Sequence, residues 1–225
     1  SALAGEALLG ALEDKSSRVK SFAAIGVGKC GMPTALPKLI EILAENNNRD
    51  VFLRHACVQG MWGLNDREKT LKETKLESGA VRRGILLALR KLVDPRAKYF
   101  LNDPEKLIHD EAIRAINDTN LITALPDLAA VIESYLGDTE NDLLPQGHRD
   151  WITHSRLINA NFRVGTPRNA SHLLQYAAQA RLPLLLRELA LHAILEWKDP
   201  TSVDPTTGYY RPLSPESRPD ISAAV

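Results

Sequence analysis

A helical pattern that recurs six times sets the strongest limit on what this chain can fold into. The anchors of its copies are Val19, Leu53, Val81, Ile108, Thr153 and Leu186. The residue after each anchor is basic or a histidine: Lys20, Arg54, Arg82, His109, His154 and Arg187. Four residues after the anchors the side chain is always apolar: Ala23, Cys57, Ile85, Ala112, Leu157 and Ala190.

Seven residues after each anchor the side chain is small: Gly26, Gly60, Ala88, Ala115, Ala160 and Ala193. Positions four and seven residues on lie on the same helix face as the anchor, so a neighbouring helix can approach closely at the small residue. The anchors are separated by roughly 27 to 45 residues, the length of one helix pair. Such a period is typical of a stacked α-solenoid.

The helices themselves can be placed from caps and apolar spacing. Before the anchor helix of five of the six copies stand residues suited to a helix N-terminus: Ser16, Asp50, Ser78, Glu105 and Asp150. Prolines suited to helix starts are Pro33, Pro95, Pro104 and Pro167. The other expected helices are Ala2–Leu12, Thr34–Asn46, Glu68–Glu77, Arg96–Leu101, Leu121–Ser134, Arg168–Gln179 and Leu184–Trp197. We therefore predict an all-α fold, an α-α superhelix of about five to six helical hairpins over residues 1–197.

Two stretches break the regularity. Gly137–Gly147 is acidic and rich in turn residues. Residues 198–225 carry five prolines and cannot be helical throughout. We expect this tail to pack as a cap or a linker, anchored by Tyr209, Tyr210 and Leu213. We expect Arg211 to reach a carboxylate or a helix C-terminus.

Composition narrows the classes of function. The chain has 225 residues and a formal net charge of zero, which argues against a nucleic-acid module. No apolar run approaches the roughly 18 residues that a membrane-spanning helix requires. The chain opens directly in a helical pattern without a signal peptide, so we interpret it as a piece of a longer protein.

The segment Gly26–Gly31 matches the G-x-G-x-x-G pattern of dinucleotide sites. That site requires the glycines to follow a strand and open a helix, where the helix N-terminus meets the pyrophosphate. Here the run is expected to end a helix instead. We therefore interpret these glycines as close helix packing followed by a glycine C-cap.

The six histidines raise the question of a metal site. The repeated His-Glu dyads of a helical di-iron centre are not found: His55 is followed by Ala56, and the carboxylates after His109 are out of phase. Cys30 and Cys57 have no zinc-type partner pair and are expected to be buried free thiols. We predict no catalytic residue, no metal and no cofactor, and we expect His109 and His154 to be hydrogen-bond partners between repeats.

The segment Asp66–Lys98 is locally basic. Its candidate partner-docking residues are Arg67, Lys72, Arg82, Arg83 and Arg90. Interleaved glutamates dilute this charge. The segment is interpreted either as a solvated helical face or as a docking patch for an acidic protein surface.

The run Val81–Leu89 and its equivalents resemble HEAT repeats of the short, PBS-lyase-like kind, and the resemblance extends to about Trp197. The segments Asp110–Ala129, Ile158–Ala177 and Trp197–Leu213 are similar to the HEAT region of large planctomycete and verrucomicrobial proteins. Those proteins typically join a sugar-dehydrogenase-like β-propeller, a HEAT region and a C-type cytochrome domain with a C-x-x-C-H motif.

This resemblance implies a periplasmic or extracellular location and a role beside a redox enzyme. Neither Cys30 nor Cys57 lies in a C-x-x-C-H motif, so the resemblance transfers no haem attachment. We therefore expect a non-catalytic scaffold whose partners are neighbouring domains or an associated redox protein. The alternatives are a HEAT-type nucleic-acid-binding protein and a HEAT-type metal-dependent enzyme. The sequence does not indicate the oligomeric state.

Overall fold

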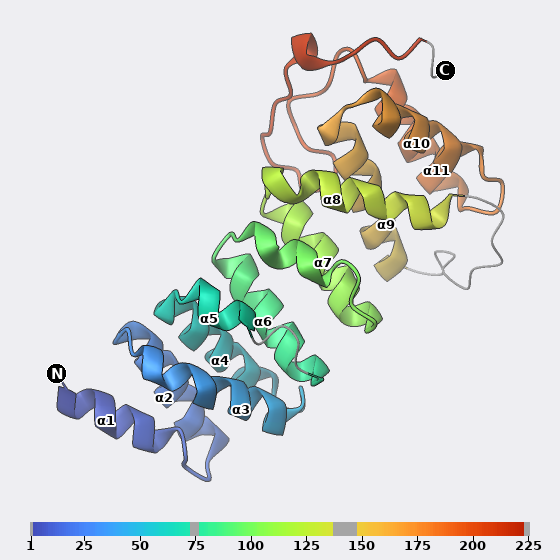
Figure 1. Ribbon diagram of the computed structural model, residues 1–225. Coiled ribbons are helices and arrows are strands. Elements are labelled where there is room, and N and C mark those ends of the chain that lie inside the picture. The colour runs from blue at the N-terminus through green and yellow to red at the C-terminus, as the bar shows by residue number, and fades with distance from the viewer. Residues whose placement is uncertain (1, 73–76, 137–147, 223–225) are drawn as a thin grey trace. The chain divides into compact units, whose positions relative to one another are not determined.

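The computed structural model describes residues 2–72, 77–136 and 148–222 (Figure 1). Within these ranges every regular element is a helix, and the only extended pairing is an isolated bridge between Val203 and Tyr210. The predicted all-α class is confirmed. The interruption expected at Gly137–Gly147 and the end of the helix expected over Glu68–Glu77 lie outside the described residues.

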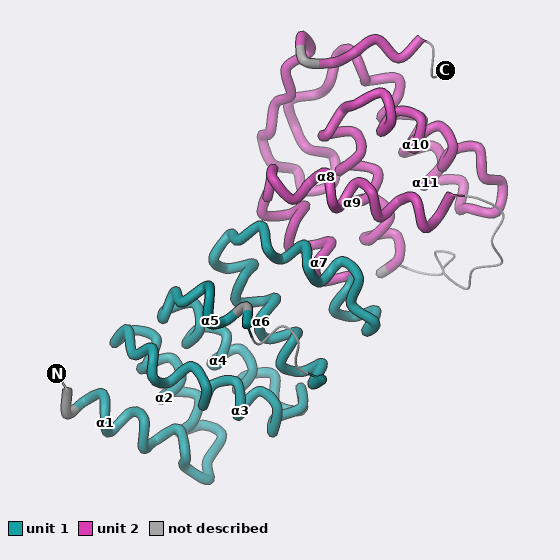
Figure 2. Tube along the Cα trace, viewed as in Figure 1, with its two compact units in different colours: residues 1–109 teal, residues 110–225 magenta. Residues whose placement is uncertain are grey.

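The chain divides into two compact units, residues 1–109 and 110–225 (Figure 2). The proline-rich residues 198–222 belong to the second unit. A single helical domain over residues 1–197 with a separate tail stays a prediction.

The first unit is built from short helices that pack on their neighbours. Its elements are α1 (Ala2–Ala11), α2 (Ser17–Lys29), η1 (Pro33–Ala35), α3 (Leu36–Asn46), α4 (Val51–Leu64), α5 (Arg67–Lys72), α6 (Gly79–Lys91) and η3 (Pro95–Phe100). Helix α2 packs against α1 and α4, and α4 also contacts α3 and α6. Asp50 caps α4 by accepting from the amides of Phe52 and Leu53, and Ser78 caps α6 by accepting from that of Val81.

Helix α7 (Lys106–Asp118) begins in the first unit and continues into the second. The remaining elements are η4 (Ile122–Ala124), α8 (Leu125–Ala130), η5 (Val131–Tyr135), α9 (His148–Val164), α10 (Pro167–Ala178), α11 (Leu184–Leu195) and η6 (Pro215–Ser217). Helix α9 contacts α8, α10 and α11. Thr166 and Asn169 form a capping box at the start of α10.

Three sequence predictions need correction in detail. The helix expected over Arg96–Leu101 is the 3-10 helix η3, and the one expected over Leu121–Ser134 is an α-helix between two 3-10 segments. The helix containing Thr153 begins at His148 rather than at Asp150. The spacing of apolar residues predicts where a helical segment lies. Over so few residues it does not distinguish an α-helix from a 3-10 helix.

The six-fold pattern marks the buried face of the helices. All six residues four after the anchors are buried, and among the anchors Val19 alone is exposed. The small residues Ala88, Ala115 and Ala160 are fully buried. The repeating positions therefore form much of the core.

The backbones of helices α2 and α4 lie in direct contact at two glycines. A Cβ placed on Gly28 would lie 2.7 Å from the carbonyl oxygen of Gly60, and one placed on Gly60 would lie 2.6 Å from that of Ala24. Helix α2 ends at Lys29, and Gly31 follows with a φ of 62°. The interpretation of Gly26–Gly31 as helix packing with a terminal glycine agrees with this geometry.

Replacing Gly60 with alanine should destabilise the protein, because the added methyl group forces α2 and α4 apart. We expect a loss of about 1–3 kcal/mol in the free energy of unfolding, measured by urea denaturation. Gly10→Ala is the matched control, since a Cβ at this position of α1 meets nothing within 4 Å. Its unfolding free energy should stay unchanged or rise by up to about 1 kcal/mol. Equal stability of the two variants would contradict the assigned crossing.

Candidate functional site

The basic residues or histidines that follow the anchors form hydrogen bonds to other segments of the chain. In four copies the partner lies just upstream of the helix. Arg54 donates to Asn48 Oδ1 at 3.2 Å, and Arg82 donates to the Glu77 carbonyl at 2.8 Å. His109 Nδ1 bonds the Leu101 carbonyl at 2.6 Å, and Arg187 donates to the Ala177 carbonyl at 2.8 Å. This position therefore holds consecutive segments together.

His154 bonds a side chain further along the chain. Its Nδ1 lies 2.7 Å from the hydroxyl oxygen of Tyr176, and its ring meets the edge of Tyr135 at 4.4 Å between centroids. Both histidines thus act as hydrogen-bond partners: His109 bonds the end of the preceding predicted unit, as expected, whereas His154 bonds the second helix of its own unit. Among the described residues, no group of three or more His, Cys, Asp or Glu side chains is arranged to hold a metal ion.

Both cysteines are free, but only one is buried. The side chain of Cys57, on α4, is buried, and this burial raises the pKa of its thiol to about 12. Cys30 is exposed, which corrects the expectation of two buried thiols. The reason is its position: it caps the C-terminus of α2 rather than lying on the packed face.

The predicted docking residues lie on α5 and α6 and differ in how accessible they are. Arg82 is held by Asp103, through two hydrogen bonds of 2.7 and 3.1 Å, and by Glu105 at 3.0 Å. Arg67 reaches Asp94 at 3.4 Å. Lys72 is exposed, and Arg83 and Arg90 are half-buried. Internal ion pairs therefore neutralise part of the segment that looks basic in the sequence.

The tail is anchored by charged residues rather than by its tyrosines. Tyr209 and Tyr210 are 61% and 75% exposed, so their predicted role as buried anchors is wrong, while Leu213 is half-buried. The chain turns at Gly208, with a φ of 72°. At this turn the backbone amide of Asp204 donates to the Tyr209 carbonyl, and the Asp204 side chain is directed into the protein.

Asp204 is the centre of this anchorage, and its carboxylate is fully buried. Oδ1 accepts from the amides of Thr206 and Thr207 at 2.9 and 3.0 Å. Oδ2 accepts from Asn159 Nδ2 at 3.1 Å and pairs with Arg211 at 3.3 Å and with Arg163 at 3.6 Å. Burial by itself would raise the pKa of Asp204, but the hydrogen bonds and the Arg163 charge outweigh it and hold the pKa below its usual value.

Arg211 ties the turn to the end of α7. Its guanidinium donates to the carbonyl of Asn117 at 3.0 Å and to that of Asp118 at 2.6 Å, while it also pairs with Asp204. The last carbonyls of a helix have no partner within the helix and carry its negative dipole end. The expectation that Arg211 reaches a carboxylate or a helix C-terminus is met by both contacts.

A second anchor lies further along the tail, at Arg218. Its guanidinium stacks over the rings of Phe162 and Trp197, at 4.5 and 4.8 Å from their centroids, and donates to the Phe162 carbonyl. Trp197 in turn donates to the Pro219 carbonyl at 3.2 Å. Burial lowers the pKa of Arg218 to about 10, with a further contribution from the charge of Arg163.

The tail does not cover α11 in the expected way. It shields Trp197, yet Leu184, Leu185, Leu191 and Leu195 stay exposed. Asp204 and Arg218 were not singled out in the sequence. The available signals were the Asp-Pro-Thr-Thr-Gly turn and the two asparagines within α9, Asn159 and Asn161, which do form buried hydrogen bonds.

No match to this chain is found among protein-family models or among curated proteins.

Removing the charge of Asp204 should destabilise the protein. In Asp204→Asn, Arg163 and Arg211 lose their buried carboxylate, which we expect to cost about 3 kcal/mol of unfolding free energy at pH 7. Because the folded pKa of Asp204 is lowered, its contribution is present above the unfolded pKa of about 3.9 and is lost as the pH falls through the folded pKa. The difference between wild type and variant should therefore shrink in acid.

Urea titrations at several pH values measure both effects. Asp199→Asn is the matched control, because this tail aspartate is exposed. Its unfolding free energy should change by no more than about 0.5 kcal/mol. A difference between wild type and Asp204→Asn that does not depend on pH would show that the carboxylate charge is not what anchors the turn.

Proposed function

We propose that this chain is a HEAT-like solenoid that acts as a non-catalytic scaffold, a module of a larger exported redox protein. The observation that carries the proposal is the six-fold pattern, whose small and apolar positions are mostly buried and whose basic positions bond neighbouring segments. In a solenoid each repeat buries its apolar face only against its neighbours, and binding of partners along an extended surface is the usual role.

The exposed surface of the first unit supports a protein partner. A hollow of about 460 Å³ opens between α2, α3 and α4. Its charged lining is Lys15, Lys20, Glu45, Arg49 and Asp50. An open hollow with charges of both signs suits the polar rim of a protein interface better than a small apolar ligand. In the described ranges no helix is both long and apolar enough to cross a membrane.

Hydrogen exchange in the full chain tests the solenoid. Gly60→Ala weakens the crossing of α2 and α4. If the repeats interact only with their neighbours, amide exchange should accelerate most in α2 and α4, less in α6, and not in α9 to α11. A uniform acceleration throughout residues 2–109 would indicate one cooperative globular core and would contradict the solenoid. Gly10→Ala again serves as the control.

The full-length product of the gene tests the functional part of the proposal. It should carry a dehydrogenase-like propeller and a segment with a C-x-x-C-H motif beside this chain. A product that joins the chain to DNA-processing domains instead would favour the nucleic-acid alternative.

Binding measurements distinguish the scaffold from that alternative. Because the net charge is zero and several arginines of the basic segment are ion-paired, affinity for DNA should be weak, with a Kd of roughly 10⁻⁴–10⁻⁶ M or weaker at physiological salt. Fluorescence anisotropy with labelled duplex at several salt concentrations measures it. A nanomolar complex that resists salt would overturn the scaffold. One iron or zinc per purified chain would favour the metal-enzyme alternative.

A further inference from the structure

Positive charge is concentrated in the first unit, although the chain as a whole is neutral. Basic residues outnumber acidic ones in residues 1–109, and acidic residues outnumber basic ones in residues 110–225. Helices α2, α4 and α6 contain basic residues but no Asp or Glu. These helices lie next to one another, because α4 packs against both α2 and α6. A group of adjacent helices in the first unit therefore carries formal charge of one sign only.

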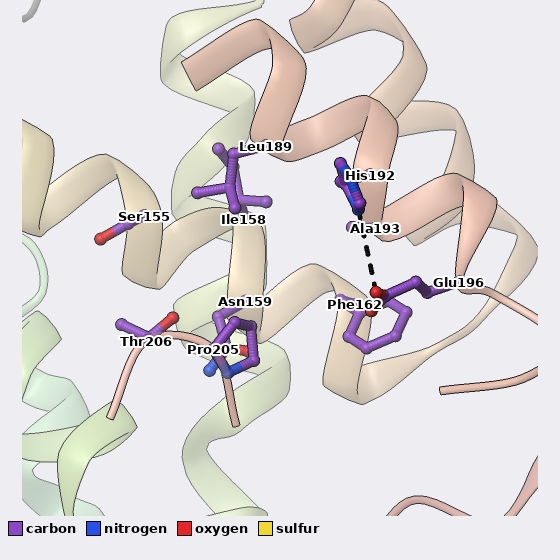
Figure 3. A pocket seen from close by; sticks show the side chains of 10 residues that line it. All are labelled: Ser155, Ile158, Asn159, Phe162, Leu189, His192, Ala193, Glu196, Pro205 and Thr206. Carbon is purple, nitrogen blue, oxygen red and sulfur yellow. Dashed lines mark ion pairs between the residues drawn. The ribbon is translucent and has the colours of Figure 1, made fainter. Parts of the chain in front are cut away.

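The hollows of the two units do not account for this charge. The pocket of the second unit, between α9, α11 and the tail turn, is mostly apolar, and its ionisable side chains are His192 and Glu196 (Figure 3). The hollow between α2, α3 and α4 mixes basic residues with Glu45 and Asp50. Positive charge without carboxylates is found instead on the solvent-exposed sides of α2, α4 and α6.

The exposed side of α4 is aromatic and carries no carboxylate. Phe52, His55 and Trp62 are exposed, and Gln59 between them is half-buried. Their spacing of three and four residues places them along one face of the helix. Phe52 is 85% exposed and Trp62 is 46% exposed, and at a rise of about 1.5 Å per residue they lie about 15 Å apart along the axis. Two large apolar side chains are thus open to solvent along α4.

Cations lie on both sides of this aromatic stripe. Arg18 and Lys29 of α2 are exposed, and so is Lys91 of α6. None of the three forms an ion pair with a described residue. The carboxylates next to the two ends of α4 already have partners, since Asp50 caps the helix and Asp66 lies in an ion pair. The cations beside α4 are therefore available to a partner.

Trp62 lies where the three helices come together. Lys91 Nζ is 4.5 Å from the centroid of its ring, a cation–π contact between α4 and α6. On the other side of α4, a Cβ on Gly63 would lie 2.6 Å from the carbonyl carbon of Gly28. The end of α2 that carries Lys29 is therefore beside this part of α4. The aromatic stripe and the cations form one continuous face.

We infer that this face, formed by the exposed sides of α2, α4 and α6, binds an acidic segment of a protein partner. Apolar side chains of the segment pack on Phe52 and Trp62. Its carboxylates pair with Arg18, Lys29 and Lys91. An apolar centre with polar groups at the rim is the usual anatomy of a protein interface, and aromatic side chains are its typical hot spots. The inference rests on the proposed scaffold role, adds the chemistry of the partner, and overlaps the predicted docking segment only at α6.

The spacing of the charges suits a helical segment. The axes of packed helices lie about 8–10 Å apart, so the cations of α2 and α6 lie at about this distance on either side of the aromatic stripe. A helix with its side chains is about 10–12 Å wide, so one amphipathic helix over α4 reaches the cations on both sides. A DNA duplex needs a row of phosphate contacts, whereas the middle of this face carries large apolar side chains.

A fluorescein-labelled helical peptide tests the inference in the full chain. The probe carries leucines along one face and glutamates along both flanks. Its control is a scrambled peptide of the same composition, which keeps the charge but has no apolar face. We expect saturable binding of the probe at micromolar concentrations, measured by fluorescence anisotropy at low salt, and about tenfold weaker binding of the scrambled peptide.

Substitutions on the face and away from it locate the binding. Trp62→Ala should weaken probe binding about tenfold, because an aromatic anchor is lost, whereas Tyr99→Ala removes an exposed ring of η3 and should have no effect. Lys29→Glu and Lys91→Glu should each weaken it about fivefold. Lys72→Glu, at an exposed position of α5, changes the net charge equally and should leave binding unchanged. Thermal melting monitored by circular dichroism verifies that the variants are folded.

Three outcomes would overturn the inference. Equal binding of the two peptides, or equal losses in Lys72→Glu and Lys29→Glu, would show a general attraction to positive charge. Displacement of the probe by single-stranded or duplex DNA at a lower concentration than by unlabelled probe would assign the face to nucleic acid. Absence of saturable binding would contradict this face alone, because the hydrogen-exchange test of the solenoid does not depend on it.

Discussion

Close approach of helix backbones at small residues is the constraint on which the first unit depends. Between α2 and α4 the separation is so short that neither Gly28 nor Gly60 leaves room for a Cβ. Around this crossing Ala24 of α2, Leu39 of α3 and Met61 of α4 are all fully buried. Dispersion and burial of apolar surface both grow with such contact, and a single methyl group at the crossing would separate both helices along their length.

The second unit depends in addition on buried charge. Desolvation of Asp204 is unfavourable, and the structure compensates it with two backbone amides, one side-chain amide and two guanidinium groups. Loss of the carboxylate would remove a partner from every other member at once, so the set is coupled through Asp204. Its members come from α9 and from the tail. These buried contacts anchor the turn that carries Tyr209 and Tyr210. The two tyrosine side chains can therefore be exposed while the tail stays bound to the helices.

The sequence predicted the features that periodicity determines, but not those that depend on distant partners. Repeats of apolar and small residues identified the all-α class and the buried positions, because burial on one helix face has the period of the helix. Tyr209 and Tyr210 were misassigned because apolar character alone says little about a short turn, whose geometry decides which side chains face inward. The kind of partner predicted for Arg211 is correct, because a carboxylate or a helix C-terminus is what neutralises an arginine. The role of Asp204 could not be predicted, because its partners on α9 are distant in the sequence.

The charge that the basic segment, Asp66–Lys98, presents to solvent also depends on its ion-pair partners in the fold. Along the chain from Asp66 to Lys98, basic residues outnumber acidic ones. In the structure, Asp94 accepts two hydrogen bonds from Arg96 and also contacts Arg67, and Asp103 accepts two from Arg82. The Arg96 guanidinium, through its side-chain hydrogen bonds above all, holds the pKa of Asp94 below its usual range, so this carboxylate stays charged at neutral pH. The positive field at the surface of this segment is therefore weaker than the sequence suggests, although Lys72 stays exposed.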